Sequence, residues 1–194
     1  MQSCEQNPAA YGGIGWHGQA TGVPQPARHW LTVSASLTAA VRAVSRDFSV
    51  RRCRESWQRP FRDEAPVLGV GVRSFERVWT REVVLADGTT PLVFAHTIAA
   101  RQALPAWPWL RGLGDRPLGE VLFEHPGVTR FPHEFRRLDA RHPLYHSAAR
   151  QFSAGLSGKV LPSPHLHARR SVFVLHGKRL LVTEVFLPDL LDRQ

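Results

Sequence analysis

Short runs of alternating hydrophobic and polar residues recur along this chain, and this two-residue period is typical of β-strands. The turns Asp87-Gly88 and His176-Gly177-Lys178 each lie between two such runs, so each predicts a hairpin. The expected strands are residues 48–57, 67–75, 78–85, 92–99, 171–175 and 180–187.

Three other segments are predicted to be helical. Ser36 is a suitable N-cap for a helix over residues 37–46. A short helix is expected over residues 117–123, with proline in its first turn, and another over residues 143–151. Helices that are separate from two hairpins predict an α+β fold with a mainly antiparallel sheet.

The N-terminal segment differs from the rest in composition. Residues 1–28 are rich in Gly, Pro, Gln and Ala and show no hydrophobic period, so we expect a flexible tail. Residues 29–194 are then expected to form a single domain, which is long enough to bury a core.

Two of the predicted strands each carry one charged side chain on an otherwise apolar face. These are Arg81 in residues 78–85 and Glu184 in residues 180–187. A buried charge is costly unless it is paired or used. One interpretation is a buried Arg81–Glu184 ion pair. The other is a pocket in which Arg81 binds a substrate carboxylate while Glu184 handles a hydroxyl or a proton. Periodicity leaves both open.

The composition narrows the choice of partners. The net charge is +9 and comes almost entirely from arginine, because the only lysines are Lys159 and Lys178. Such a charge suits nucleic acid, a small polyanionic substrate or a solvated basic surface. The chain has neither a compact basic run nor a recognisable nucleic-acid motif, so we expect no nucleic-acid partner.

Other classes of function are also disfavoured. We expect no membrane insertion, because no apolar run approaches the roughly 18 residues of a membrane span. The absence of a signal peptide and the presence of only Cys4 and Cys53 favour a cytoplasmic protein. Four histidines could suggest zinc, but no His-Glu-x-x-His motif or paired cysteine motif occurs, so we expect no metal site. They are His142, His146, His165 and His167.

Four blocks, in this order, resemble the motifs of the chorismate pyruvate-lyase family: WTREVVLADG (79–88), RPLGEVLF (116–123), ARRS (168–171) and LLVTEVFLP (180–188). The resemblance implies conversion of chorismate to 4-hydroxybenzoate and pyruvate, the first committed step of ubiquinone biosynthesis, without metal or organic cofactor. It also implies a six-stranded antiparallel sheet and an internal ligand pocket under two helical flaps. We expect a monomer whose partner is the anionic small molecule chorismate.

The resemblance also implies roles for individual residues. The family's carboxylate-binding arginine falls on Arg81, and its active-site glutamate on Glu184. Flap hydrophobes fall on Leu37 and Leu118. His96 stands where the family usually has arginine, so we expect a weaker, pH-dependent second anion contact there.

An alternative of another class is a non-catalytic sensor. The ligand-binding domains of one group of bacterial transcription regulators share this fold without the lyase activity, and they normally follow a DNA-binding winged helix. The first 28 residues cannot form such a helix-rich domain. Retention of both Arg81 and Glu184 favours the enzyme.

Overall fold

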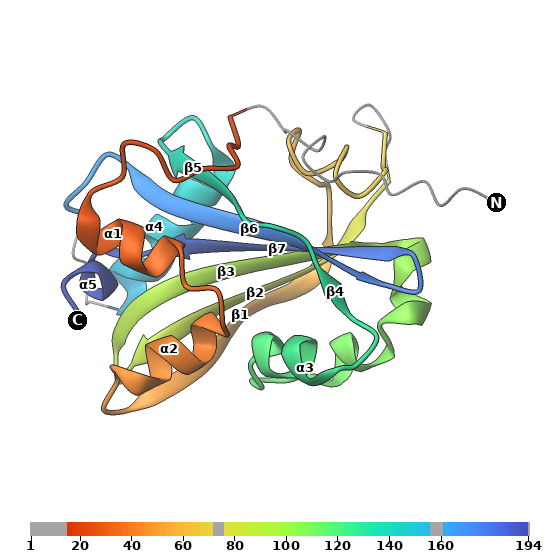
Figure 1. Cartoon of the computed structure of the whole chain (residues 1–194), viewed down its shortest axis with the longest axis horizontal. Coiled ribbons are helices and arrows are strands. Elements are labelled where there is room, and N and C mark those ends of the chain that lie inside the picture. Colours follow the sequence, from red (N-terminus) through yellow and green to blue (C-terminus); the bar gives the residue numbers. More distant parts are fainter. Residues whose placement is uncertain (1–14, 72–75, 156–160, 194) are drawn as a thin grey trace.

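An antiparallel sheet forms the centre of the protein, in a computed structural model that describes residues 15–71, 76–155 and 161–193 (Figure 1). The strand order is β1–β2–β3–β7–β6–β4, and β5 also pairs with β6. The strands are β1 Phe48–Gln58, β2 Val78–Asp87, β3 Thr90–Ala100, β4 Thr129–Arg130, β5 Glu134–Leu138, β6 Leu166–Leu175 and β7 Lys178–Phe186.

In the described ranges the sheet has seven strands where we expected six. The difference lies at the edge beside β6, which two short strands share. β4 pairs with Phe173 and Val174, while β5 pairs with β6 from Leu166 to Arg170. The sheet is therefore six strands wide, and the irregular segment before β6 supplies its outer edge.

Both predicted hairpins form, but one predicted strand does not. His176 and Gly177 have φ angles of 49° and 72°, the left-handed conformation that a tight hairpin turn requires. The strand prediction for residues 67–75 is wrong over 67–71, which form turns, and residues 72–75 lie outside the described residues. Val67 and Val70 are nonetheless buried, because this turning segment packs on the core. Its hydrophobic residues indicated burial rather than extended backbone.

The predicted helices are present with shifted ends. Ser36 caps α2 as expected, since its side chain accepts a hydrogen bond of 3.3 Å from the backbone N–H of Ala39. The α-helices are α1 Gln25–Leu31, α2 Leu37–Ala43, α3 Leu118–Glu124, α4 Pro143–Gly155 and α5 Pro188–Leu191, and two 3₁₀ helices are η2 Arg101–Ala106 and η3 Pro108–Gly112. None of the described helices is long and apolar enough to cross a membrane.

The ordered chain begins earlier than we predicted. Residues 1–14 lie outside the described residues, but the tail prediction is wrong for residues 15–28. Trp16 is buried, and its Nε1 donates a 2.6 Å hydrogen bond to Asp63 Oδ2. Ala27 of α1 is also buried. A segment without hydrophobic period is thus anchored by a few side chains.

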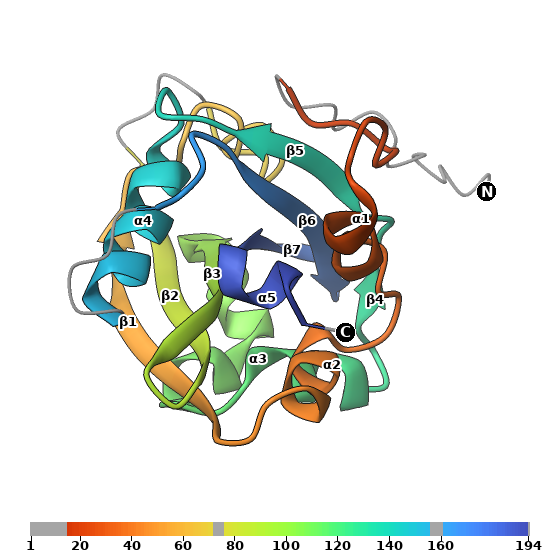
Figure 2. The ribbon, with the colours of Figure 1, turned by 90° about the vertical axis from the view of Figure 1, so that its left-hand side faces the viewer.

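Different helices cover the two faces of the sheet. α4 packs through Leu144, Ala148 and Phe152 against a face that includes Phe94 and Val185. The helices α2 and α3 lie together on the opposite side, as both views show (Figures 1 and 2). This second face, with α2 and α3 over it, holds the site described next.

Candidate active site

An internal pocket lies between the sheet and the helices α2 and α3. Four neighbouring strands supply its floor, with residues spaced two apart as the pleat requires. The floor residues are Arg81, Val83 and Leu85 of β2, Ala95 and Thr97 of β3, Val182 and Glu184 of β7, and Arg169, Ser171 and Phe173 of β6. Leu37, Thr38, Leu118, Gly119, Leu122 and Phe123 lie over it, and Pro117, Arg130 and His133 complete the lining.

The strand register places Arg81 and Glu184 in neighbouring rows of this floor. Arg81 pairs with Thr97, whereas Glu184 pairs with Ala95, and Ala95 pairs in turn with Val83 of β2. The two charged residues are therefore two strands and two residues apart, or about 12 Å between Cα atoms from standard strand spacings. No ion pair joins them in the described structure, so that interpretation is wrong. The spacing leaves room for a ring between their side chains.

Arg81 is a buried cation with unused donors. Its side chain is among the largest fully buried ones, and its Nη2 donates to the carbonyl oxygens of Gly114 (2.9 Å) and Arg116 (3.0 Å). Gly114 has a φ angle of 55°, a conformation in the turn before α3 that glycine adopts without strain. Nε of Arg81 is buried and has no hydrogen-bond partner among the described residues. Burial lowers the pKa of Arg81, against the opposing charge of Glu55. A ligand carboxylate would complete its hydrogen bonds.

Glu184 is held by Arg169 of the adjacent strand. Arg169 Nε donates a 2.6 Å hydrogen bond to Glu184 Oε2. Its Nη1 donates to the carbonyl oxygens of Leu31 (3.1 Å) and Val33 (2.6 Å), at the end of α1 and just after it. Among the described residues no donor contacts the other oxygen, Oε1. Glu184 is thus a fixed carboxylate with one oxygen available to a ligand.

The predicted flap residues Leu37 and Leu118 both line the pocket. The two flaps are in close contact, because a Cβ atom on Gly119 would lie 3.2 Å from Thr38 Oγ1. An ion pair of 2.7 Å between Arg42 and Glu120 also joins them. Both helices therefore close over the floor.

Sequence reasoning missed several polar residues of the lining. Thr97, Arg169 and Ser171 follow the same two-residue period that identified Arg81 and Glu184, so this signal was available. Arg130 and His133 come from the irregular segment before β6, which has no such period. They reach the pocket only through tertiary packing.

The pocket carries an excess of positive charge. Burial, followed by the charges of Arg169 and Arg130, lowers the pKa of His133 to about 3, so this imidazole is neutral at physiological pH. Among the described lining residues, three arginines (81, 130 and 169) then accompany a single carboxylate, Glu184, which leaves two net positive charges. The site therefore suits a ligand with two negative charges.

His96 does not reach the pocket, so the expectation of an anion contact there is wrong. Its side chain lies on the other face of the sheet, where Nδ1 is 3.1 Å from Glu82 Oε1 and Nε2 is 3.2 Å from Glu64 Oε1. An irregularity in the β2–β3 ladder explains the placement. Asp87 pairs with Thr90, and an uninterrupted ladder would set Arg81 opposite His96. Leu92 is inserted as an extra residue, and Thr97 faces the pocket instead.

The pH dependence of stability should report on His96. The two carboxylates raise its pKa to about 9, although burial opposes this. A raised folded-state pKa stabilises the protein fully below the unfolded value of about 6.5, and this contribution disappears as the pH rises through about 9. We expect the melting temperature to fall between pH 7 and pH 10. His96→Gln should cost about 3 kcal/mol at pH 7, because it removes the cation that lies between two buried carboxylates, and should flatten this fall.

Thermal denaturation at pH 7, 8, 9 and 10 measures this effect. The matched control is His29→Gln, since His29 is an exposed residue of α1. Equal pH profiles for wild type and His96→Gln would contradict the assignment.

The histidines considered for zinc have other contacts. His142 Nε2 lies 3.2 Å from Asp63 Oδ2, and His146 Nε2 lies 2.7 Å from the carbonyl oxygen of Ala140. Within the described ranges, no group of three or more His, Cys, Asp and Glu side chains could hold a metal ion.

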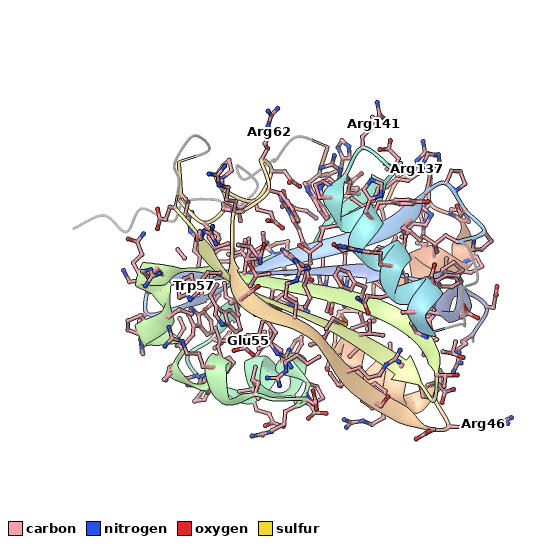
Figure 3. All side chains as sticks on the ribbon, turned by 180° about the vertical axis from the view of Figure 1, so that it is seen from behind. Arg46, Glu55, Trp57, Arg62, Arg137 and Arg141 are labelled. Atoms are coloured by element: carbon pink, nitrogen blue, oxygen red, sulfur yellow. The ribbon has the colours of Figure 1, made fainter. Side chains whose placement is uncertain are left out.

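The positive charge of the chain is divided between interior and surface. Arg81, Arg169 and Arg170 are fully buried. Of the arginines labelled in Figure 3, Arg62, Arg137 and Arg141 project from the upper side, while Arg46 projects at the lower right. Part of the net charge thus serves internal contacts.

The fold is shared with effector-binding domains of bacterial repressors. The trehalose repressor domain of B. subtilis matches with a TM-score of 0.51 and 9% identity over 73% of this chain and 91% of that chain. The C-terminal domain of the histidine utilization repressor from Pseudomonas syringae pv. tomato matches with a TM-score of 0.52 and 10% identity over 73% and 92%. At such low identity the likeness shows the fold alone.

The sequence comparisons are more specific. The family model for chorismate lyase matches residues 16–194. A probable chorismate pyruvate-lyase of Cupriavidus pinatubonensis is 48% identical over 88% of this chain and 85% of its own. Another from Thiobacillus denitrificans is 41% identical over 97% and 95%. The chain belongs to the chorismate lyase family.

Proposed function

We propose that this protein is a chorismate lyase, which converts chorismate to 4-hydroxybenzoate and pyruvate at the first committed step of ubiquinone biosynthesis. The proposal rests on the arrangement of charged residues on the pocket floor of this protein. Arg81 and Glu184 share one face of the sheet, two strands apart, in a lining with two net positive charges. Chorismate has two carboxylates, so its charge complements the site.

Arg81 binds the ring carboxylate in this proposal. Its Nε is buried and unpaired, and its Nη2 is fixed by the carbonyl oxygens of Gly114 and Arg116. An arginine held in this way meets a carboxylate with little loss of side-chain entropy. Leu37 and Leu118 cover the ring from above. The ring then extends from Arg81 toward Glu184.

Glu184 accepts a hydrogen bond from the hydroxyl group on C4. The reaction breaks the ether bond at C3 and removes the hydrogen on C4, and the resulting aromatisation drives it. The protein needs to supply orientation and charge control. Glu184 either takes the C4 proton or orients the ring while that hydrogen passes to the departing side chain. Arg169 fixes the carboxylate for either role.

Incubation of the purified protein with chorismate tests the function directly, with pyruvate and 4-hydroxybenzoate measured together. Equimolar formation of the two products is the expected result. Binding of chorismate or 4-hydroxybenzoate without turnover would instead favour the sensor. If the protein neither binds nor converts chorismate, the proposal is wrong.

Closed flaps predict slow release of the aromatic product. Gly119→Ala should accelerate this release several-fold, because the added Cβ lies 3.2 Å from Thr38 Oγ1 and separates α2 from α3. Stopped-flow measurement of 4-hydroxybenzoate dissociation gives the rate. The matched control is Gly112→Ala in η3, where a Cβ would meet nothing within 4 Å. Unchanged dissociation in Gly119→Ala would show that these helices do not gate release.

The setting of the enzyme follows from the same proposal. The protein acts in the cytoplasm as a monomer, on a diffusible substrate, and needs no metal, organic cofactor or nucleic acid. Chorismate is its small-molecule partner. Activity that persists after exhaustive dialysis against a chelator, with a monomer mass by light scattering, is the expected result.

A further inference from the structure

We propose that Arg130 binds the second carboxylate of the substrate, the one on the enolpyruvyl side chain. This inference rests on the proposed function and deepens it. Arg130 belongs to the edge strand β4 and lines the pocket. Its Nη2 donates a 2.7 Å hydrogen bond to the carbonyl oxygen of Ser34, and in the described part of the chain no carboxylate pairs with it. It is a partly buried cation without a counter-ion.

Arg130 lies at the Glu184 end of the pocket. Its Nη2 donates to the carbonyl oxygen of Ser34, and Nη1 of Arg169 donates to the adjacent carbonyl oxygen of Val33 at 2.6 Å. Because Arg169 also holds Glu184 through its Nε, the guanidinium of Arg130 lies near this carboxylate. Chorismate bears its side chain on C3, next to the carbon that bears the hydroxyl group. When Arg81 holds the ring carboxylate and Glu184 the hydroxyl, the side-chain carboxylate lies at this same end.

The other cationic candidates at that end are unsuitable. Arg169 already donates to Glu184 Oε2 and to the carbonyl oxygens of Leu31 and Val33. His133 is neutral, because its pKa is lowered to about 3, and its Nδ1 lies 2.7 Å from Ser171 Oγ. Arg130 is therefore the cation that remains for a second anion at this end of the described pocket.

This placement has a consequence for selectivity. Cleavage transfers the side-chain carboxylate to pyruvate, and 4-hydroxybenzoate keeps only the ring carboxylate and the hydroxyl group. Arg130 thus contacts the substrate but loses its partner when pyruvate leaves. A residue with this role strengthens binding of chorismate and contributes little to retention of the aromatic product.

Arg130 also has structural contacts that the test must separate from binding. Its guanidinium carbon lies 5.1 Å from the ring centroid of Phe123 in α3, and Ser34 precedes α2. Loss of Arg130 could therefore loosen both flaps. A loosened flap would weaken the binding of both chorismate and 4-hydroxybenzoate. Loss of a contact with the side-chain carboxylate would weaken the binding of chorismate alone.

The experiment compares Arg130→Gln and Arg130→Lys with the wild type. We measure the steady-state constants for chorismate and the Kd of 4-hydroxybenzoate. Arg130→Gln should lower kcat/KM about 10- to 100-fold, mainly through KM, since one charge-assisted contact is lost. The Kd of 4-hydroxybenzoate should change less than about threefold, the scale of an indirect effect. Arg130→Lys should recover part of the loss, because it keeps the charge.

The matched control is Arg42→Gln. Arg42 joins α2 to Glu120 of α3 at 2.7 Å and also lies over the ring of Phe48, but it does not line the pocket. Its loss therefore affects flap closure without removing a ligand contact. Arg42→Gln should change the KM for chorismate and the Kd of 4-hydroxybenzoate by the same small factor. Equal weakening of both ligands in Arg130→Gln, or an unchanged KM, would overturn the inference while the wild type remains active. A wild type that does not convert chorismate would overturn the proposed function, and this inference with it.

Discussion

Arg81→Gln should lower kcat/KM for chorismate by a factor of about 30 to 3,000. Removing one partner of a buried, hydrogen-bonded charge pair costs about 2–5 kcal/mol, and each 1.4 kcal/mol is a factor of ten. The variant should also bind 4-hydroxybenzoate more weakly, because both chorismate and 4-hydroxybenzoate carry the ring carboxylate. Arg81→Lys should recover only part of the activity, since an ammonium group cannot form the same two-point contact.

The control for Arg81 must reproduce the loss of a buried arginine. Arg170→Gln does so, because Arg170 is equally buried in the same sheet but faces away from the pocket, where its Nε donates to Glu134 Oε2 at 2.8 Å. It should lower the melting temperature and leave kcat/KM of the folded protein within about threefold, as an indirect effect would. Full activity in Arg81→Gln would remove the basis of the proposed function.

Glu184→Gln should separate the two possible roles of this residue. If Glu184 removes the C4 proton, kcat falls by about 10²–10⁴, which is the usual contribution of a general base. If it only orients the ring, the amide still accepts a hydrogen bond through its oxygen, and kcat falls about tenfold, as for one hydrogen bond weakened by roughly 1.4 kcal/mol. Single-turnover kinetics with chorismate isolate this step from product release.

The matched control is Glu82→Gln, because Glu82 is a glutamate of the same sheet that is more deeply buried than Glu184. Glu82 faces the opposite side, where its Oε1 is 3.1 Å from His96 Nδ1. This variant should reduce stability and leave the single-turnover rate of the folded protein nearly unchanged. A wild-type rate in Glu184→Gln would show that Glu184 takes no part in the reaction.

Arg81 and His96 show how much of the pocket lining can be predicted from the alternation of residues within single strands. Alternation along one strand fixes which residues share a face, so Arg81 and Glu184 were identified correctly as charges on apolar faces. Alternation along one strand does not show which residues of the neighbouring strand lie on the same face of the sheet. That depends on the register, and the extra residue at Leu92 shifts the β2–β3 register by one. His96 consequently faces Glu82, and Thr97 faces the ligand side.

The ion-pair partner of Glu184 could not be predicted from the local sequence pattern either. Its ion pair is with Arg169, because β7 lies between β3 and β6 and the β6–β7 register sets these two residues opposite each other. The ARRS block contained Arg169, but its contact with Glu184 depends on strand order. The same holds for Arg130, which comes from a two-residue strand that only the edge of β6 organises.

Local signals in the sequence were enough to predict several elements. These are the Ser36 cap, the two hairpin turns, and the charged residues on the apolar faces of β2 and β7. Four features depend on long-range packing: the conformation of residues 67–71, the anchoring of Trp16, the ion-pair partner of Glu184 and the positive charge around it. The physical reason is that backbone preference acts over a few residues, whereas pairing of buried charges depends on which distant segments the sheet sets side by side.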